Sequence, residues 1–348
     1  MRIRTTLIVL LGFCVLAVAP ATADQNAPRR DVVYYGDRHL SLPQTVTRVA
    51  TTWEAHNAVI AMLGYGDRIV ATTRIARSMP VFRKFVPSIV NASLAGTGGS
   101  AGVNVEEMMA LRPDVLFVTD MLPPAKKEQL AQAGIAVAAF RANSIDAIVE
   151  RTLITGEIFG GEAHDIAKRY ADYFENNRRR VRERLEKIPE GKRLKVYLAS
   201  GAPLTTSGRP SLNQDWMDLG GAINVAENWF QGRPNASGTA ILENVVASNP
   251  DVIIAMRARD VETIRNSPQW SMIKAVRDGR VHVNPRGMFW WCRETSEEAL
   301  QFLWVAKLLY PDAFADIDMA AETRAFYKDF YRIDLSDDEI RDFLSPTD

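Results

Sequence analysis

Two patterns of apolar residues, one typical of strands and one typical of helices, alternate along the first part of the chain. The short apolar run Val46–Ala50 is typical of a buried strand, whereas Ala55–Leu63 has the spacing of apolar residues that a helix needs. Gly64 follows as a helix C-cap, and a second extended run begins at Ile69. Strands and helices that alternate in this way predict a mainly parallel sheet covered by helices on both faces.

One pattern of residues occurs twice, at Glu106–Val118 (EEMMALRPDVLFV) and at Glu243–Ala255 (ENVVASNPDVIIA). Each copy begins with glutamate, passes through an apolar stretch to Pro-Asp and ends in apolar residues, and Asn104 precedes the first copy as a good helix N-cap. Proline stops a helix, and an apolar run fills a sheet. Each copy therefore predicts a short helix, a turn and a buried strand, and the repetition indicates two lobes of similar architecture.

The stretch between the two copies changes to a purely helical pattern. Ser144–Ile188 contains no strand-like run and is broken once, at Gly160–Gly161. The part after the break would be about 40 Å long as a helix. We therefore predict an α/β protein of two Rossmann-like lobes with mainly parallel sheets, bridged by a single long helix. The expected boundaries are an N-terminal lobe over 24–143, a helical bridge over 144–190, and a C-terminal lobe with C-terminal helices over 191–348.

The charge and the N-terminus restrict the class of protein. The chain has 42 basic and 42 acidic residues, which argues against nucleic acid as the main partner. Residues 1–23 have a basic start, an apolar run shorter than a membrane span and a small-residue cleavage site before Asp24, so we predict a signal peptide and a periplasmic protein. Phe13 before Cys14 favours simple export over a lipid anchor. Cys292 alone remains after cleavage, which excludes an internal disulfide.

The glycine-rich segment Gly96–Gly102 imitates a dinucleotide-binding fingerprint. It lacks a clear strand directly before it and is not on the first strand-to-helix turn, so we do not expect a nucleotide site. Its glycines either let backbone NH groups at the start of the helix at Asn104 approach a ligand or only turn tightly. The four histidines are too scattered for a spaced metal motif, so we expect no metal site made by the protein.

Candidate ligand-binding residues lie in loops after predicted strands, in the glycine-rich segment and in the aromatic segment GMFWWC. Guanidinium groups bind oxygen-rich anions, and aromatic faces bury the flat or apolar parts of a ligand. In parallel sheets, ligands bind at the carboxyl ends of strands, which is where these arginines fall. One of the two adjacent tryptophans is expected in the core. The candidates are Trp53, Arg74, Arg77, Thr97, Arg257, Arg286, Trp290, Trp291 and Arg293.

Several segments resemble the periplasmic binding proteins of siderophore, haem and cobalamin ABC importers. The residues that carry the resemblance run from 36 to 73 and continue in VNVEEMMALRPDVLFV, LAQAGIAVAAF, LGGAINVAEN and ENVVASNPDVIIA. The resemblance covers roughly residues 34 to 310 in the order of that family. It implies two lobes bridged by a long helix, a ligand cleft between them and limited hinge motion. It also implies that Glu106 and Glu243 meet arginines on the membrane permease.

On this basis we expect a monomeric receptor that delivers a small ligand to an ABC permease dimer with a cytoplasmic ATPase. The expected ligand is a ferric siderophore or related metal chelate, with Fe³⁺ carried as part of the ligand and no cofactor of the protein's own. The runner-up is an oxyanion, because MFWWCRETSEEALQFLWVAKLLYPDAF resembles a subgroup in which some members take molybdate or tungstate. Haem and cobalamin come next. Other classes are an exported α/β enzyme, for which no nucleophile, base and orienting group emerge, and a structural or adhesive protein.

Overall fold

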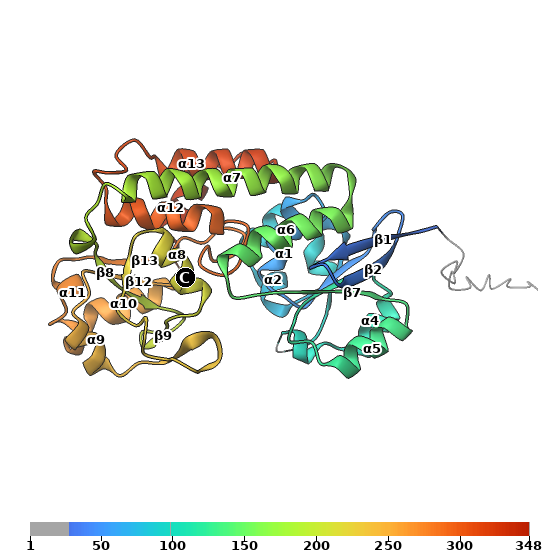
Figure 1. Cartoon of the computed structure of the whole chain (residues 1–348), viewed down its shortest axis with the longest axis horizontal. Coiled ribbons are helices and arrows are strands. Elements are labelled where there is room, and N and C mark those ends of the chain that lie inside the picture. The colour runs from blue at the N-terminus through green and yellow to red at the C-terminus, as the bar shows by residue number, and fades with distance from the viewer. Residues whose placement is uncertain (1–27, 98, 348) are drawn as a thin grey trace, which may run out of the picture.

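The computed structural model describes residues 28–97 and 99–347 (Figure 1). The predicted signal peptide, with Cys14, lies outside these residues. Within them, no helix is long and apolar enough to cross a membrane.

The N-terminal lobe is built on a five-stranded parallel sheet with the strand order β5-β4-β3-β6-β7. An antiparallel hairpin, β1 (Arg29–Tyr34) and β2 (Arg38–Pro43), precedes it. The sheet strands are β3 (Val49–Thr51), β4 (Ile69–Thr72), β5 (Ser93–Leu94), β6 (Val115–Thr119) and β7 (Ala136–Phe140). The helices are α1 (His56–Met62), α2 (Arg74–Ser78), α3 (Pro80–Phe85), α4 (Val105–Leu111) and α5 (Pro124–Gln132), with 3-10 turns η1 (Gly66–Arg68), η2 (Pro87–Asn91) and η3 (Ser100–Gly102).

The C-terminal lobe repeats the plan with a four-stranded parallel sheet in the order β10-β8-β12-β13. Its strands are β8 (Lys195–Ala199), β10 (Ile223–Asn224), β12 (Val252–Ala255) and β13 (Val281–Val283). A short antiparallel pair, β9 (Thr205–Ser207) and β11 (Ser237–Thr239), lies beside it. The helices are α8 (Leu212–Leu219), α9 (Leu242–Ser248), α10 (Ala258–Asn266) and α11 (Lys274–Arg277), with 3-10 turns η4 (Glu190–Lys192), η5 (Pro234–Ala236) and η6 (Pro268–Trp270).

Both copies of the repeated sequence form a helix, a turn and a strand, as predicted. They are α4 with β6 and α9 with β12. The aspartate of each copy then fastens the neighbouring parallel strand. Asp114 Oδ2 accepts from the backbone N of Arg48, at 2.8 Å, just before β3, and Asp251 Oδ2 accepts from the backbone N of Lys195, at 2.9 Å, where β8 begins. The repetition therefore includes a shared way of aligning two strands.

A long helix joins the lobes, as predicted (Figure 1). The helical stretch forms α6 (Ile145–Phe159) and α7 (Gly161–Leu185), and α7 spans both lobes. The break falls at Gly160, whose φ of 74° is a left-handed value that glycine adopts readily. Because the two helices turn back on each other there, α6 stays beside the N-terminal lobe while α7 crosses to the other.

The C-terminal helices contact both lobes, although the sequence analysis placed them with the C-terminal lobe alone. They are α12 (Glu298–Leu309), α13 (Met319–Phe326), a π-helical turn η7 (Tyr327–Tyr331) and α14 (Asp337–Leu344). Tyr331 donates a hydrogen bond to the carbonyl oxygen of Ala58 in α1, at 3.0 Å. Lys84 of α3 pairs with Glu339 of α14, with 2.7 Å between Nζ and Oε1. The end of the chain thus returns to the first lobe.

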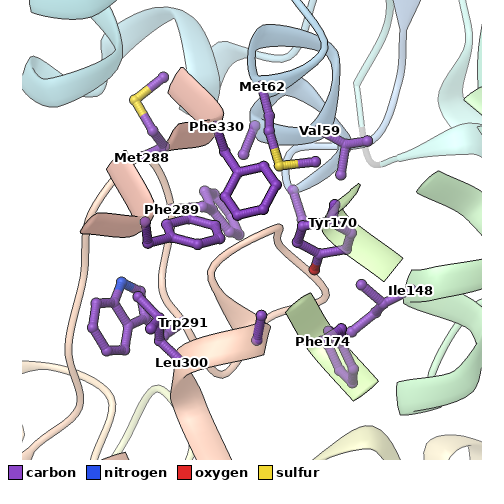
Figure 2. Packing of buried hydrophobic residues seen from close by; sticks show 14 of the residues in the cluster. Val59, Met62, Ile148, Tyr170, Phe174, Met288, Phe289, Trp291, Leu300 and Phe330 are labelled. Carbon is purple, nitrogen blue, oxygen red and sulfur yellow. The ribbon is translucent and has the colours of Figure 1, made fainter. Parts of the chain in front are cut away.

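The two lobes share one hydrophobic core (Figure 2). It contains Phe117 from the first sheet, Leu198 from the second, and Tyr170 and Phe174 from α7, all of them buried. Figure 2 shows side chains of α1, α6 and α7 converging with Phe289 and Trp291 of the C-terminal half. Each sheet packs its opposite face on a smaller core of its own lobe. One face of each sheet therefore packs against the core of its own lobe, and the other face packs against the core that the two lobes share.

The contact between α6 and α7 depends on Gly156. A Cβ atom at this position would lie 2.5 Å from the Cβ of Ala167 and 3.0 Å from the carbonyl oxygen of Ala163. Alanine is the better helix former by about 1 kcal/mol, but overpacking costs about 1–3 kcal/mol, and contacts this short with a neighbouring helix place the cost in the upper half of that range. We predict that Gly156→Ala lowers the free energy of unfolding by about 1–2 kcal/mol, measured by urea denaturation.

The control is Gly191→Ala, since a Cβ atom there meets no heavy atom within 4 Å. Its stability should stay within about 0.5 kcal/mol of the wild type. A Gly156→Ala variant as stable as the wild type would show that the two helices are not packed this closely.

Candidate ligand-binding site

A cleft of about 400 Å³ lies between the lobes at the carboxyl ends of β3 and β12. This is the edge of a parallel sheet where ligands of α/β proteins bind. The N-terminal lobe contributes Trp53, Glu54, Ala55, Ile75 and Asn143, and the C-terminal half contributes Leu212, Asn213, Met256, Arg257, Phe289, Trp290, Cys292, Arg293 and Glu294. A larger hollow of about 880 Å³ is lined by α10, β13 and the C-terminal helices alone. The smaller cleft is the better candidate because both lobes line it.

The N-terminal wall is held by a buried polar network beneath Trp53 and Glu54. The side-chain amide of Asn57 donates to both of their carbonyl oxygens, each at 3.0 Å. Thr72 of β4 donates to Asn57 Oδ1 at 2.6 Å, and Thr51 Oγ1 accepts from the backbone N of Trp53 at 3.1 Å. The network fixes the turn between β3 and α1, so the wall keeps its position without a ligand.

Two arginines give the C-terminal wall its positive charge. Arg257 is half-buried ahead of α10, and its guanidinium makes no hydrogen bond or ion pair with the residues that the structure describes. The Nη2 of Arg293 donates to the hydroxyl of Ser200 at 2.8 Å, and its Nε lies 3.1 Å from the sulfur of Met256. Neither cation is paired with a carboxylate in the described part of the chain. Both can therefore attract an anionic ligand.

The floor of the cleft is made by two residues with left-handed backbones. Asn143 and Glu294 have φ values of 63° and 49°, which are uncommon for residues other than glycine. The carboxylate of Glu294 accepts from the backbone N of Asn143. Asn143 Oδ1 accepts from the backbone N of Leu212 at 3.2 Å, and Asp215 accepts from the backbone N of Ile145 at 3.1 Å. These bonds cross from one lobe to the other.

Four of the predicted ligand residues line the cleft: Trp53, Arg257, Trp290 and Arg293. Trp290 is half-buried there, whereas the adjacent Trp291 has no exposed surface and packs in the shared core. The expectation that one of this pair is a core residue is met by Trp291. The two side chains leave neighbouring positions of a turn in different directions, which the sequence does not reveal.

The structure does not bring the other predicted residues to the cleft. Arg74 is exposed at the start of α2, and Arg77 donates to the carbonyl oxygen of Ala92 at 3.1 Å. Arg286 donates to the carbonyl oxygen of Thr347 at 3.1 Å, and its guanidinium carbon lies 5.7 Å from the ring centre of Trp290. Arg286 thus reaches a lining residue without lining the cleft itself.

The glycine-rich segment forms a closed turn. Thr97 is exposed there, and its backbone N donates to the carbonyl oxygen of Gly102 at 3.0 Å. A Cβ atom on Gly102 would lie 1.3 Å from the carbonyl oxygen of Thr97, so only glycine fits this close approach. The tight turn accounts for Gly96 and Gly102, where a Cβ atom would meet backbone atoms of the turn itself. Asn104 then caps α4 as predicted, accepting from the backbone N of Glu107 at 3.1 Å.

The candidates taken from the sequence omit the polar lining residues Glu54, Asn143, Asn213 and Glu294. Glu54 and Glu294 stand next to candidates and Asn143 stands next to a predicted helix start, and that position was the available signal. The left-handed backbones and cross-lobe bonds of Asn143 and Glu294 were not visible in the pattern. The described residues contain no cluster of histidine, cysteine and carboxylate side chains that could hold a metal ion.

Glu106 and Glu243 do not line the cleft. Both are exposed in the first turns of α4 and α9, respectively. These two helices lie on the side of the molecule opposite α7 (Figure 1).

Below the floor, Glu298 is completely buried. Burial raises the pKa of its carboxyl well above the ordinary value, and the nearby Glu294 carboxylate raises it further, while Arg151 opposes the shift. Between the ordinary and the raised pKa, the folded protein holds a proton that the unfolded chain has lost. The free energy of unfolding therefore decreases as the pH rises above about 4.5, and the Glu298 carboxyl accounts for up to about 1.4 kcal/mol of this decrease per pH unit.

We predict that Glu298→Gln removes this pH dependence. Glutamine has the same shape but stays neutral, so the variant should gain stability over the wild type as the pH is raised above about 4.5. Urea denaturation at several pH values measures the difference. Parallel curves for the two proteins would mean that Glu298 does not keep its proton in the folded state.

Comparisons with known proteins agree with this architecture. The sequence model of the family described as "Periplasmic binding protein" matches residues 49–286. The molybdate-binding protein MolA of Haemophilus influenzae is 28% identical over 336 residues, covering 87% of this chain and 91% of its own length. A cobalamin-binding protein of Halobacterium salinarum is 26% identical over 272 residues, 73% of this chain and 68% of its own. A periplasmic solute-binding protein from Veillonella parvula has the same fold, with a TM-score of 0.80, 24% identity, and coverage of 91% of this chain and 97% of that one.

Proposed function

This chain belongs to the periplasmic binding protein family of ABC importers, and from that premise we propose that it captures a small oxyanion of the molybdate and tungstate class. Its relatives are substrate-binding proteins of transporters and not enzymes. In this proposal residues 1–23 direct export to the periplasm, and the mature protein carries the anion between its lobes to the permease.

The observation that carries the proposal is the pair of arginines in the cleft. Arg257 and Arg293 reach the same cleft of about 400 Å³, and neither is paired with a carboxylate in the described structure. A guanidinium group presents several N–H donors in a plane and binds oxyanions through two of them at once. The similarity to a molybdate-binding protein over most of both chains supports the same ligand class.

The size of the cleft favours a compact ligand. Pockets for small molecules range from about 300 to 1,000 Å³, and this cleft is near the lower end of that range. From the sequence a ferric siderophore is expected first and an oxyanion second; we propose the reverse order, for which the size and the charge of the cleft are the support.

A metal chelate is the second candidate. Trp53, Met256, Phe289 and Trp290 give part of the cleft an apolar and aromatic lining, which a chelate with an organic shell would use. The similarity to a cobalamin-binding protein supports this alternative.

Glu54 limits which ligands the cleft accepts. It lies on the N-terminal wall of the same cleft and makes no side-chain hydrogen bond or ion pair with a described residue. Its carboxylate repels a fully deprotonated anion and attracts a ligand that donates a hydrogen bond or exposes a positive charge. The change in ligand affinity when the Glu54 carboxylate is removed therefore indicates the class of ligand.

Docking on the permease is proposed to use Glu106 and Glu243. Their helices lie on one side of the molecule, one on each lobe, with both carboxylates exposed (Figure 1). A permease of two similar halves would meet one acidic point from each lobe. Exposed charge pairs of this kind contribute more to encounter rate and register than to affinity.

The two cleft arginines are tested by molybdate binding, measured by calorimetry and by the tryptophan fluorescence of the mature protein. Arg257→Ala and Arg293→Ala should each weaken binding by about 1.5–3 kcal/mol, or roughly 10- to 150-fold, because each removes charge-assisted hydrogen bonds. Arg83→Ala is the matched control, since Arg83 is exposed in α3 and does not line the cleft. It should bind nearly as the wild type does.

Glu54→Gln tests whether the ligand is repelled by the negative charge of Glu54. Molybdate should bind this variant more tightly than the wild type because a negative charge leaves the cleft. Weaker binding of molybdate by Glu54→Gln, or unchanged binding by both arginine variants, would contradict the oxyanion proposal. Tight binding of a ferric chelate by a wild-type protein that ignores molybdate would favour the second candidate.

The two docking glutamates are tested by transport. The double variant Glu106→Ala with Glu243→Ala should bind ligand normally, yet support much less uptake in cells and less stimulation of the ATPase in vesicles. Each single variant should lose less. If the double variant supports full uptake and full stimulation, the two glutamates are only favourable partners of the helix dipoles, worth about 0.3–1 kcal/mol each.

A further inference from the structure

Arg151 is a completely buried arginine at the junction of the lobes. It lies in α6, has no exposed surface, and forms no ion pair with any described residue. Its Nε and Nη1 have no hydrogen-bond partner in the described structure. Arginine is almost never fully buried unless it is paired, since an unpaired buried charge is costly. A side chain kept at such a cost needs a reason other than stability.

The contacts of Arg151 reach both walls of the cleft from behind. Its guanidinium carbon lies 4.0 Å from the ring centre of Trp53, which lines the cleft from the N-terminal lobe. Its Nη2 donates to the carbonyl oxygen of Glu294, which lines the cleft from the C-terminal half. One planar group therefore stacks on one wall and hydrogen-bonds the other. Lysine, whose ammonium group is compact and not planar, cannot make both contacts in the same way.

The hydrogen bond to Glu294 holds a backbone that would otherwise be unfavourable. Glu294 has a left-handed φ of 49°, a conformation that costs free energy unless its surroundings fix it. Arg293, the residue before it, carries one of the two cleft cations. The carbonyl oxygen that Arg151 holds is thus one residue from a guanidinium that faces the ligand.

We propose that Arg151 is a positioning residue for ligand binding, which holds Trp53 and the Arg293–Glu294 turn in register across the cleft without touching the ligand. The proposal rests on the oxyanion function. It separates affinity from stability, because the desolvation cost of a buried charge can equal or exceed what its contacts contribute, so an apolar side chain of similar length need not lower the stability.

The test compares Arg151→Met and Arg151→Lys with the wild type, using molybdate as the ligand. Both variants should bind molybdate at least about tenfold more weakly, while the thermal midpoint of ligand-free Arg151→Met stays equal to the wild type or rises. The control is Arg180→Met in α7, whose guanidinium pairs with Glu322 away from the cleft. That variant should bind as the wild type does, whatever its stability.

A double-mutant cycle separates positioning from general damage. In a Trp53→Phe background, Arg151→Met should weaken molybdate binding clearly less than in the wild type, because part of its effect passes through the indole. The near-UV circular dichroism of Arg151→Met should also differ from the wild type, and this difference should shrink in the Trp53→Phe background. This second readout needs no ligand.

Wild-type affinity in Arg151→Met and Arg151→Lys would overturn the proposal, as would additive effects in the cycle. Loss of affinity that only follows loss of stability, with an unchanged dichroism spectrum, would also overturn it. Failure of the wild type to bind molybdate would instead count against the proposed function, and the dichroism comparison would still decide whether Arg151 positions Trp53.

Discussion

The hydrophobic core that the two lobes share is the constraint on which the rest of the structure depends. It runs from the sheet of the N-terminal lobe through α6 and α7 to the sheet of the other lobe and the C-terminal helices. Moving the lobes apart would expose part of this core, and each 100 Å² of exposed apolar surface costs about 2.5 kcal/mol. Large hinge opening is therefore expensive. A ligand bound in the proposed cleft would meet walls that are already close to their final positions, which reduces the entropic cost of binding.

Polar groups also connect the two lobes, in addition to the shared hydrophobic core. At the junction, Asn143 and Glu294 connect the lobes through hydrogen bonds, and Arg151 lies beneath both walls. Such buried polar groups add little to stability, and an unpaired one subtracts from it. Proteins often break local rules of this kind at functional sites. Here two of the left-handed residues, Asn143 and Glu294, lie at the floor of the cleft that holds Arg257 and Arg293, and the buried Arg151 lies beneath it. Others, such as Arg112 and Asn249, end helices away from it.

The sequence predicted the features that depend on local patterns. Gly160 broke the helical stretch where the chain needed a left-handed residue, and both Pro-Asp copies formed the expected turn before a buried strand. It did not predict features that depend on which way a side chain or a helix turns. Of the two adjacent tryptophans, Trp290 lines the cleft and Trp291 is buried in the core. Arg77 points away from the cleft and donates to the carbonyl oxygen of Ala92. Arg151 had one signal in the sequence, its spacing: it stands three residues after Ile148 and four before Thr155, which places it on the same helix face as these two residues, and the structure buries both.

The central claim is that an oxyanion binds between the lobes at the two arginines. Anomalous diffraction from crystals of the mature protein grown with tungstate tests it most directly, because tungsten scatters anomalously and marks its own position. We expect one strong peak in the cleft, with ligand oxygens within hydrogen-bond distance of Arg257 and Arg293 and beside Trp53. A peak elsewhere on the molecule, or no peak in protein crystals with the cleft open to solvent, would contradict the account.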